Sequence, residues 1–500
     1  MDTYRNAAAV LLAVAAFVCS GCSGTAGNSG VSPAASVVLK NSQQGQSGGM
    51  IDYDGDGIED LVVGAPYAIS GDKVGALLVY RGSANGFTVM PTWVLTGDDN
   101  FGYSFTSLGD VDGDSKADFA VGAYNGDGTD VSLSGSVTVY KGGSSGQVIA
   151  KLAGETALDK FGLAIKGGCD LNGDGIKDII VGAPFNSPTP SLYQGGAVYV
   201  YFGPDFKESA RVKLPATANA TGLGNAVTCG DLNGDNIGDL VVGANGKVLV
   251  YYGKPGFSPA TDTPDVTIKN ADGKFGSSLA VIGDLNGDGL GELVIGAPNA
   301  TASLGGATNA RVGRIYLVKG GTGSRTINLA LNSTTATPNA NADLLTWIDG
   351  AAYFDRFGFA VAPAGDVDGD GKPDLAISAV FADKDGATSI TTGLTAGKVY
   401  LLKGKDLMID GMATPISMAT VFNGPDYNMQ YGNFLYPFTK NGPKLLVGAP
   451  TVNKQAGSVY GVSLEAGSAA APIFNAGGSG NSTTDHDCCA KTVLKGGKRP

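Results

Sequence analysis

Histidine is almost missing from this chain of 500 residues. The one histidine, His486, lies in the C-terminal tail, outside every repeated segment. Catalytic triads and most zinc sites depend on imidazole groups. The main body of the chain can therefore form neither, although paired carboxylates could still act as acid and base.

Basic charge is also scarce. Charged residues make up 16% of the chain, and the formal net charge is −12. A nucleic-acid partner would require a basic face, so we expect no nucleic acid to bind. Glycine, in contrast, is abundant, with 79 residues. This composition indicates many short segments joined by turns.

Cysteines are few for a chain of this length. Beyond Cys22 they are Cys169, Cys229, Cys488 and Cys489. Four cysteines in so long a chain do not make a disulfide framework. Cys169 and Cys229 fall in corresponding strands of successive repeats, where small buried side chains are expected. A bridge between these two is the alternative.

Long apolar runs are absent after the N-terminus. The run 7–18 follows Arg5 and is too short to span a bilayer, so residues 1–21 are predicted to be a secretory signal. The Ser-Gly-Cys that ends at Cys22 resembles a bacterial lipoprotein cleavage site with Cys22 as the lipidated residue, and an ordinary signal peptide is the alternative. Residues 22–35 have the composition of a flexible tether. We therefore expect an exported outer-membrane lipoprotein of the bacterial cell envelope, on its periplasmic side or its surface.

A repeated pattern fills most of the remaining chain. Each copy has a Phe-Gly-like segment, an acidic loop and an apolar strand that ends in Gly-Ala, often followed by Pro. Seven copies of the Gly-Ala element follow one another at intervals of 53–82 residues, with Ser378-Ala379 as the variant in the sixth. Such a period indicates a repeat architecture.

Each copy contains four short segments with the alternation and turn residues of β-strands. We predict an all-β fold, a seven-bladed β-propeller of four-stranded blades over residues 36–465. Residues 37–41 look like the fourth strand of a blade and are predicted to complete the seventh blade. Residues 466–500 are predicted to be a disordered tail.

The acidic loops have the pattern Asp-x-Asp/Asn-Gly-Asp-Gly-x-x-Asp and begin at Asp52, Asp110, Asp170, Asp231, Asp284 and Asp366 (loops 1 to 6). Oxygens at positions one, three, five and nine, with the carbonyl at position seven, suit Ca²⁺, which accepts six to eight such ligands. Position four is always glycine, and position six is glycine in four loops and Asn236 in one, which is consistent with a left-handed backbone. In loop 2 position six is Ser115, so we predict that this loop is strained or binds more weakly.

We predict up to six Ca²⁺ ions. The predicted ligands are Asp52, Asp54, Asp56, Ile58 and Asp60; Asp110, Asp112, Asp114, Lys116 and Asp118; Asp170, Asn172, Asp174, Ile176 and Asp178; Asp231, Asn233, Asp235, Ile237 and Asp239; Asp284, Asn286, Asp288, Leu290 and Glu292; and Asp366, Asp368, Asp370, Lys372 and Asp374. These loops hold 21 of the 46 acidic residues, and six Ca²⁺ ions would cancel the formal charge.

Two other interpretations of the loops are weaker. An EF-hand needs flanking helices and a Glu at position twelve, where this chain has Val or Ile inside an apolar strand. Simple Asp-Gly turns would not recur six times in one register. The loops are therefore predicted to be calcium-binding hairpin connections.

The combined Phe-Gly, acidic-loop and Gly-Ala-Pro pattern over residues 36–465 resembles the FG-GAP repeat family, best known from the propeller of integrin α subunits. The resemblance implies that Ca²⁺ lies in loops between the first two strands of each blade, on the lower face. It also implies that ligands and partners meet the opposite, upper face. Because no inserted adhesion domain separates the blades here, the integrin partner and its ligands are not carried over.

The upper face is formed by the connections between the second and third strands and between blades. The longest are 296–313, 378–397 and 331–356. Binding residues concentrate on such loops, and the candidates are Trp347, Tyr353 and Phe354, with packing beneath their own loop as the alternative.

We therefore expect a calcium-binding, membrane-anchored, adhesion-like module that binds a protein or glycan ligand and is not an enzyme. The alternatives are a scaffold subunit of an envelope complex and a propeller enzyme acting on polysaccharide.

Overall fold

The computed structural model describes residues 42–475 apart from 71–72, 84–85, 89, 98, 129–130, 144–145, 188–193, 217–220, 260–262, 272, 305–306, 330–340, 384–394, 408–410, 426–429, 439–443, 452–456 and 465–470. All described residues belong to one compact unit, residues 36–500. The predicted signal, tether and lipidated Cys22, and the predicted strand 37–41, lie outside the described residues. Within the described residues, no helix is long and apolar enough to cross a membrane.

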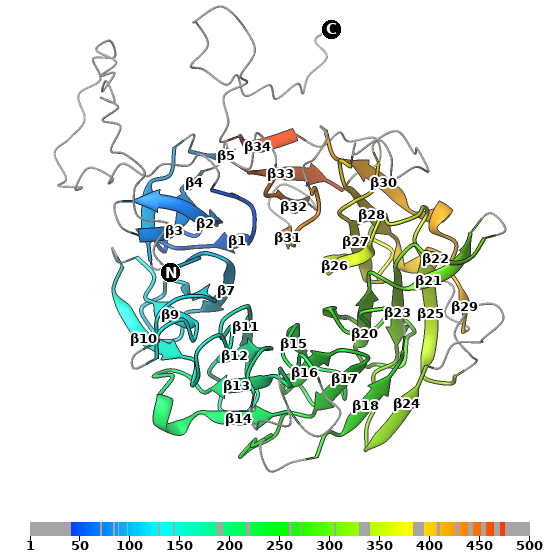
Figure 1. Ribbon diagram of the computed structural model, residues 1–500, viewed down its shortest axis with the longest axis horizontal. Helices are drawn as coiled ribbons and strands as arrows, with labels where there is room; N and C mark the ends of the chain where they lie inside the picture. The colour runs from blue at the N-terminus through cyan, green and yellow to red at the C-terminus, as the bar shows by residue number, and fades with distance from the viewer. Residues whose placement is uncertain are drawn as a thin grey trace, which may run out of the picture. The chain divides into compact units, whose positions relative to one another are not determined.

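Seven sheets make up the fold, and we number them as blades in chain order (Figure 1). Blade 1 contains β1 (Gly48–Ile51), β2 (Asp60–Ser70), β3 (Lys73–Tyr80) and β6 (Trp93–Thr96). Blade 2 contains β7 (Ser104–Gly109), β8 (Asp118–Ala123), β9 (Ser136–Tyr140) and β10 (Val148–Ala153). Blade 3 contains β11 (Ala164–Cys169), β12 (Asp178–Ala183), β13 (Ala197–Tyr201) and β14 (Val212–Pro215).

The remaining blades repeat this plan. Blade 4 contains β15 (Val227–Gly230), β16 (Asp239–Ala244), β17 (Lys247–Tyr251) and β18 (Val266–Lys269). Blade 5 contains β19 (Ser278–Ile282), β20 (Glu292–Ala297), β23 (Arg314–Val318) and β25 (Leu344–Asp349). Blade 6 contains β26 (Phe357–Gly365), β27 (Asp374–Ala379), β28 (Lys398–Leu402) and β30 (Thr420–Asn423). Blade 7 contains β31 (Leu435–Phe438), β32 (Lys444–Ala449), β33 (Ser458–Ser463) and β34 (Ala471–Asn475).

A few short elements lie between these strands. They are the two-stranded sheets β4 (Gly82–Ser83) with β5 (Gly86–Phe87) and β21 (Thr301–Leu304) with β22 (Ala307–Arg311), and the 3₁₀ turns η1 (Glu208–Ala210), η3 (Gly404–Asp406) and η4 (Ile416–Met418). Blades 4 and 5 each gain a fifth, parallel outer strand, β24 (Arg325–Asn328) and β29 (Met412–Ala413) respectively. Each fifth strand comes from the third-to-fourth connection of the following blade and covers an edge that would otherwise be open.

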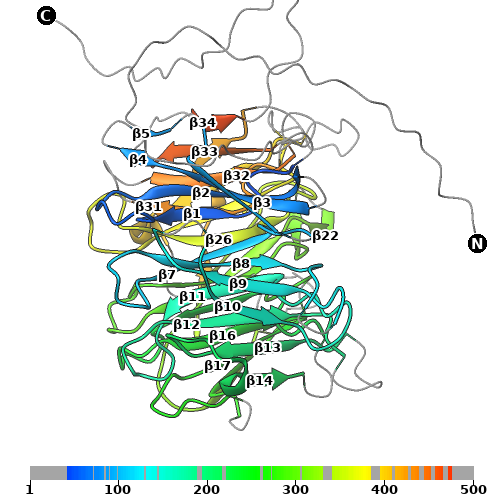
Figure 2. The ribbon, with the colours of Figure 1, turned by 90° about the vertical axis from the view of Figure 1, so that its left-hand side faces the viewer.

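The first strand of every blade lines the centre of the ring. Each contacts the first strand of the next blade, and β31 contacts β1, so the ring closes (Figures 1 and 2). The second strands, such as β8 and β12, are buried along their whole length. They are sandwiched between neighbouring blades, which explains why their sequences are continuous apolar runs. The predicted seven-bladed all-β propeller is confirmed.

The Phe-Gly segment joins neighbouring blades. Phe101 of blade 2 bridges Gly75 of blade 1, and Phe357 of blade 6 bridges Gly313 of blade 5. At the ring closure Gln44 takes this place and bridges Gly457 of blade 7. Gln44 is fully buried. The first repeat therefore contacts its neighbouring blade through the same backbone bridge as the other repeats, although it lacks the phenylalanine.

The Gly-Ala element is small because two blades meet there. A Cβ built on Gly64 would lie 2.0 Å from the carbonyl oxygen of Gly102 in the next blade. At Gly64 a side chain larger than hydrogen would push these two blades apart, which explains why glycine holds this position in every blade except the sixth, where it is Ser378.

The seventh blade is completed differently from the prediction. Its outermost strand is β34, which pairs with β33 through residues such as Asn475 and Ser458. The predicted boundary at residue 465 is therefore wrong, because the chain returns to the sheet at 471–475 and satisfies the outer edge of β33 from the C-terminal side.

Candidate metal centres

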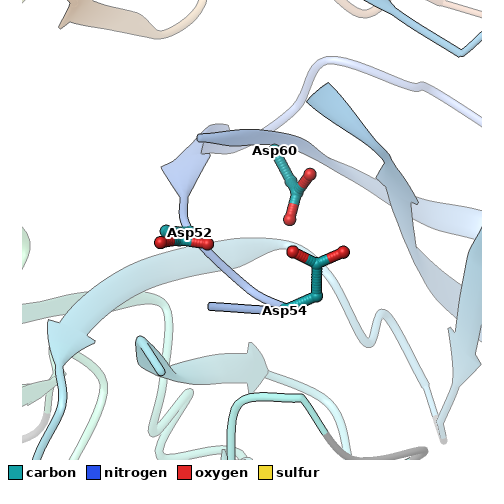
Figure 3. A group of neighbouring side chains, drawn as sticks. All are labelled: Asp52, Asp54 and Asp60. Atoms are coloured by element: carbon teal, nitrogen blue, oxygen red, sulfur yellow. The ribbon is translucent and has the colours of Figure 1, made fainter. Parts of the chain in front are cut away.

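The six acidic loops connect the first and second strands of blades 1 to 6. In blade 1, Asp52 directly follows β1 and Asp60 is the first residue of β2. Figure 3 shows the carboxylates of Asp52, Asp54 and Asp60 around one shared space. All six loops lie at the same end of their blades, as predicted.

The first aspartate of each loop organises the backbone. In loop 1, Asp52 accepts hydrogen bonds from the N–H groups of Gly55 and Gly57, both at 2.9 Å. The same two bonds occur in the other five loops at 2.6–2.8 Å. These bonds within the loop hold its backbone in a tight turn without help from an ion.

Left-handed residues make the tight fold possible. Position four is glycine with φ of 73–82° in every loop. Position six is also left-handed, including the two residues that are not glycine, Ser115 (φ 68°) and Asn236 (φ 65°). Asn tolerates this conformation better than Ser, so loop 2 carries the predicted backbone strain.

The ninth position is a buried carboxylate that fastens the loop to its blade. Asp60 accepts hydrogen bonds from the N–H groups of Tyr53, at 3.1 Å, and Gly82, at 2.7 Å. Gly82 follows the third strand, so this side chain ties two connections together. Glu292 occupies the position in loop 5 and accepts from Leu285 N–H at 2.6 Å.

Burial raises the pKa of these ninth-position carboxyls. It raises the pKa of Asp60 to about 6, and that of Asp178, Asp239 and Glu292 to about 7. Hydrogen bonds from backbone N–H groups act in the opposite direction, and the neighbouring loop carboxylates raise the pKa further. A cation that neutralises the cluster would favour the ionised form.

Carboxylates converge in four of the loops. One oxygen from each of three residues lies within 4.8 Å of the others in the groups Asp52, Asp54 and Asp60; Asp110, Asp112 and Asp118; Asp284, Asp288 and Glu292; and Asp366, Asp368 and Asp374. In loops 3 and 4 the third position is an amide, and Asn172 donates to Asp174 at 3.0 Å. The donor set is therefore richest in carboxylates in loops 1, 2 and 6.

The residues fit a hard divalent cation. In loop 6 the Oδ1 atom of Asp368 is buried and has no hydrogen-bond partner among the described residues. It lies in the group that includes Asp366 and Asp374. A buried oxygen without a partner costs free energy, and a Ca²⁺ ion coordinated by the three carboxylates would supply that partner.

Basic side chains reach into these carboxylate-rich loops, which the sequence analysis missed. Arg81 contacts Asp54 and Asp56, and Lys141 contacts Asp112 and Asp114. In loop 6, Lys403 and Lys405 contact Asp368. Arg81, Lys141 and Lys403 each directly follow the third strand of their blade. The sequence carried a partial signal. Phe202 and Tyr252 hold this place in blades 3 and 4, whose loops carry asparagine at position three, but Lys319 holds it in blade 5, whose loop carries Asn286.

Trp347 does not lie in an upper-face loop, and its prediction as a ligand-binding residue is corrected. It belongs to β25, where it pairs with Tyr316, and its exposed fraction is 9%. It packs in a core shared by blades 4 and 5, against residues such as Val250 and Leu293. The prediction failed because the segment 331–356 is not one connection: it contains β25, the fourth strand of blade 5.

Tyr353 and Phe354 lie where the sequence placed them, in the connection from blade 5 to blade 6. Their exposed fractions are 37% and 40%, and their ring centroids are 5.3 Å apart. Their role in ligand binding remains a prediction.

Cys169 and Cys229 form a disulfide between β11 and β15, with a Cα–Cα distance of 6.3 Å. The expectation of two separate thiols is therefore corrected. The two cysteines differ in distance from their acidic loops, but a bulge between Gly167 and Cys169 shifts the register of β11. Because of that shift, Cys169 lies beside Cys229, although the two residues do not occupy equivalent positions in their repeats.

Comparisons with known proteins agree with this geometry. The FG-GAP repeat model matches residues 44–80, 101–140, 275–318 and 357–402, and the FG-GAP-like repeat model matches residues 170–242. Integrin alpha-PS5 of Drosophila melanogaster is 33% identical over 174 residues, which cover 31% of this chain and 17% of that protein.

Two further relatives have similar coverage. Integrin alpha-5 of Xenopus laevis is 29% identical over 225 residues, 41% of this chain and 21% of that protein. Integrin alpha-V of Gallus gallus is 35% identical over 177 residues, 34% of this chain and 16% of that protein. The similarity thus spans about a fifth or less of these relatives. Over the residues matched, the β-propeller of this chain carries FG-GAP-type repeats and is similar to integrin α subunits.

Proposed function

We propose that this chain is a calcium-stabilised binding module of the bacterial cell envelope, attached to the membrane through a lipid on Cys22. Its ligand is a protein or a glycan that meets the upper face. The chain acts by adhesion-like binding and not by catalysis. Up to six Ca²⁺ ions occupy the acidic loops on the opposite face.

The observation that carries this proposal is the separation of the two faces. The acidic loops follow the first strands of six blades, at one end of the ring. The exposed pair Tyr353 and Phe354 lies in a blade-to-blade connection at the other end. Exposed aromatic side chains on a rigid scaffold are suited to anchoring a partner. The similarity to integrin α subunits supports binding as the class of function.

The loops contribute to this function through stability. In loop 1 the side chain at position one holds the loop backbone, and the side chain at position nine ties the loop to its blade. Bound Ca²⁺ supplies the charge that allows the remaining carboxylates to stay ionised at close range. Binding to the folded chain alone raises the free energy of unfolding.

The test is a pull-down from native bacterial envelope with the immobilised propeller, with and without a calcium chelator. We expect the wild-type protein to retain a ligand in calcium, and the Tyr353→Ser/Phe354→Ser variant to retain less of it at an unchanged melting temperature. Retention of a fixed set of protein subunits in constant proportion would instead support the scaffold alternative. Turnover of a polysaccharide by the purified propeller would contradict the proposal.

A further inference from the structure

The centre of the ring contains a cavity of about 550 Å³. Its wall is formed by residues at the Phe-Gly end of the first strands of all seven blades. No residue of the six acidic loops lines it. The cavity therefore lies toward the upper face. Figure 1 shows the inner strands that surround the centre of the ring.

Every charged side chain that lines this cavity is positive. The three are Lys166, Lys274 and Arg356, and within the described residues no Asp or Glu contributes to the wall. This is notable in a chain whose formal net charge is −12. The loops gather carboxylates at one end of the ring, and the cavity gathers cations on the other side. A cluster of one sign around a concave site attracts ligands of the opposite sign.

Lys166 is an unusual residue for its place in the fold. Its partner in the sheet is Ile180, the third residue of the second strand. The residues at the same position of the other six blades are Gly49, Thr106, Thr228, Ala280, Ala362 and Tyr436. Lys166 is thus the one charged residue at this level of the wall.

No described residue supplies a counter-ion to the ammonium group of Lys166, and its side chain makes neither a hydrogen bond nor an ion pair with any of them. Burial lowers its pKa, which reflects the cost of removing a cation from water without a partner. A cation kept in such a position suits a ligand that carries the missing negative charge.

The other two cations stand at the mouth of the cavity. Lys274 and Arg356 each directly precede a Phe-Gly segment and have a left-handed backbone, with φ of 59° and 56°. The guanidinium of Arg356 lies 4.5 Å from the ring centroid of Phe381. This contact places the guanidinium by an aromatic ring, and no described carboxylate forms an ion pair with it.

The rest of the wall is aromatic and amide-rich. Tyr103, Phe359 and Phe434 line the cavity as aromatic residues. Asn225 and Asn433 supply amides that both donate and accept hydrogen bonds. A volume of about 550 Å³ also falls in the usual range for sites that enclose a small molecule.

We propose that this cavity binds a carboxylate-bearing sugar at the end of an acidic glycan, with Lys166 paired to the carboxylate and Lys274 and Arg356 guiding the glycan in. Aromatic residues, amides and cations together match a compact ligand that combines hydroxyl groups with one negative charge. This inference rests on the proposed binding function and names the class of ligand.

The experiment compares acidic glycans with their neutral counterparts. The full-length protein, loaded with calcium, is applied to an array of uronate- and sialate-terminated oligosaccharides and the same chains with esterified carboxylates. The tightest binder is then titrated calorimetrically. We expect at least a tenfold preference for the acid over its ester, and weaker binding at high salt because screening reduces attraction between charges.

Lys166→Met is the diagnostic variant, because it keeps the length of the side chain and removes its charge. We expect it to lose at least tenfold in affinity for the acidic glycan while its melting temperature stays the same or rises. The matched control is Lys207→Met, a lysine with an exposed side chain that pairs with Asp205. Its affinity should equal that of the wild type.

Three outcomes would overturn the inference. They are equal binding of acids and esters, unchanged affinity of Lys166→Met, and binding of acidic peptides in place of glycans. The envelope pull-down separates this inference from the proposed function. If Lys166→Met captures the same ligand as the wild type, the binding function stands and the cavity site fails. If the wild type captures nothing, the binding function itself fails.

Discussion

The guanidinium of Arg81 lies 2.8 Å from the carboxylate of Asp54, at the third position of loop 1. It contacts Asp56 as well, at 3.0 Å. The chain therefore supplies its own positive charge to a loop built for a cation, and a bound ion must share these carboxylates with the arginine.

Replacement of Arg81 by methionine should strengthen ion binding in loop 1. The exposed ion pair is worth up to about 1 kcal/mol, so we expect roughly a two- to fivefold gain in affinity. Trp93 stacks on Tyr53 of the loop at 4.8 Å, so terbium luminescence excited through Trp93 reports this site, and competition with Ca²⁺ gives its affinity. Lys207→Met is the control, and an unchanged affinity in Arg81→Met would show that the arginine does not compete.

Stability should depend on pH in opposite senses with and without calcium. Without calcium, the folded-state pKa values of Asp178, Asp239 and Glu292, each raised to about 7, exceed the unfolded values near 4. Protonation then favours the folded state, so the free energy of unfolding rises as pH falls from about 7 toward 4. With saturating calcium, protons compete with the ion, and the free energy of unfolding falls over the same range.

Urea denaturation in chelator and in calcium, at pH values between 7 and 4.5, measures this reversal. Identical pH profiles in the two conditions would mean that these carboxylates do not hold the ion.

Trp347 should be required for folding and not for ligand binding. Its side chain is almost fully buried, and truncation of such a residue to alanine costs about 3–5 kcal/mol. We expect Trp347→Ala to lower the midpoint of urea denaturation accordingly. Phe354→Ala, at an exposed position of the neighbouring connection, should change the free energy of unfolding by less than about 0.5 kcal/mol. Equal effects of the two substitutions would contradict the assignment of Trp347 to the core.

Ser115→Gly should stabilise the protein. Ser115 has φ of 68° at a position where four other loops have glycine. Relief of the left-handed conformation is worth about 1–2 kcal/mol, partly offset by the entropy of a more flexible unfolded chain. We expect a net gain of up to about 1 kcal/mol in urea denaturation. Asn236→Gly is the matched control and should gain less, and a larger gain there would refute the strain argument.

The Cys169–Cys229 bridge should stabilise the join between blades 3 and 4. The two cysteines are separated by 60 positions in the sequence, and closing a loop of this length stabilises a protein by about 2–4 kcal/mol. We expect the double variant Cys169→Ser/Cys229→Ser to unfold at correspondingly lower urea. Serine at Cys488 and Cys489 provides the control, and no change in the first variant would show that packing alone holds these blades.

Local chemistry is what the sequence by itself determined. The acidic loops recur in one register, and the bonds that the first aspartate accepts lie within the loop itself, as the bonds from Gly55 and Gly57 to Asp52 show. The glycine of the Gly-Ala element and the apolar second strands repeat for the same reason in each blade. Seven blades, six loops and their left-handed turns could therefore be predicted without coordinates.

Only the tertiary structure decided which distant segments meet. Trp347 is buried because β24 leaves blade 5 to pair with blade 4, and periodicity within one repeat cannot reveal that detour. The bridge from Cys169 depends on a bulge in β11. Lys166, Lys274 and Arg356 come from three different blades and share a cavity only because the ring closes. Closure is a property of contacts between blades, whereas the repeated sequence specifies each blade separately.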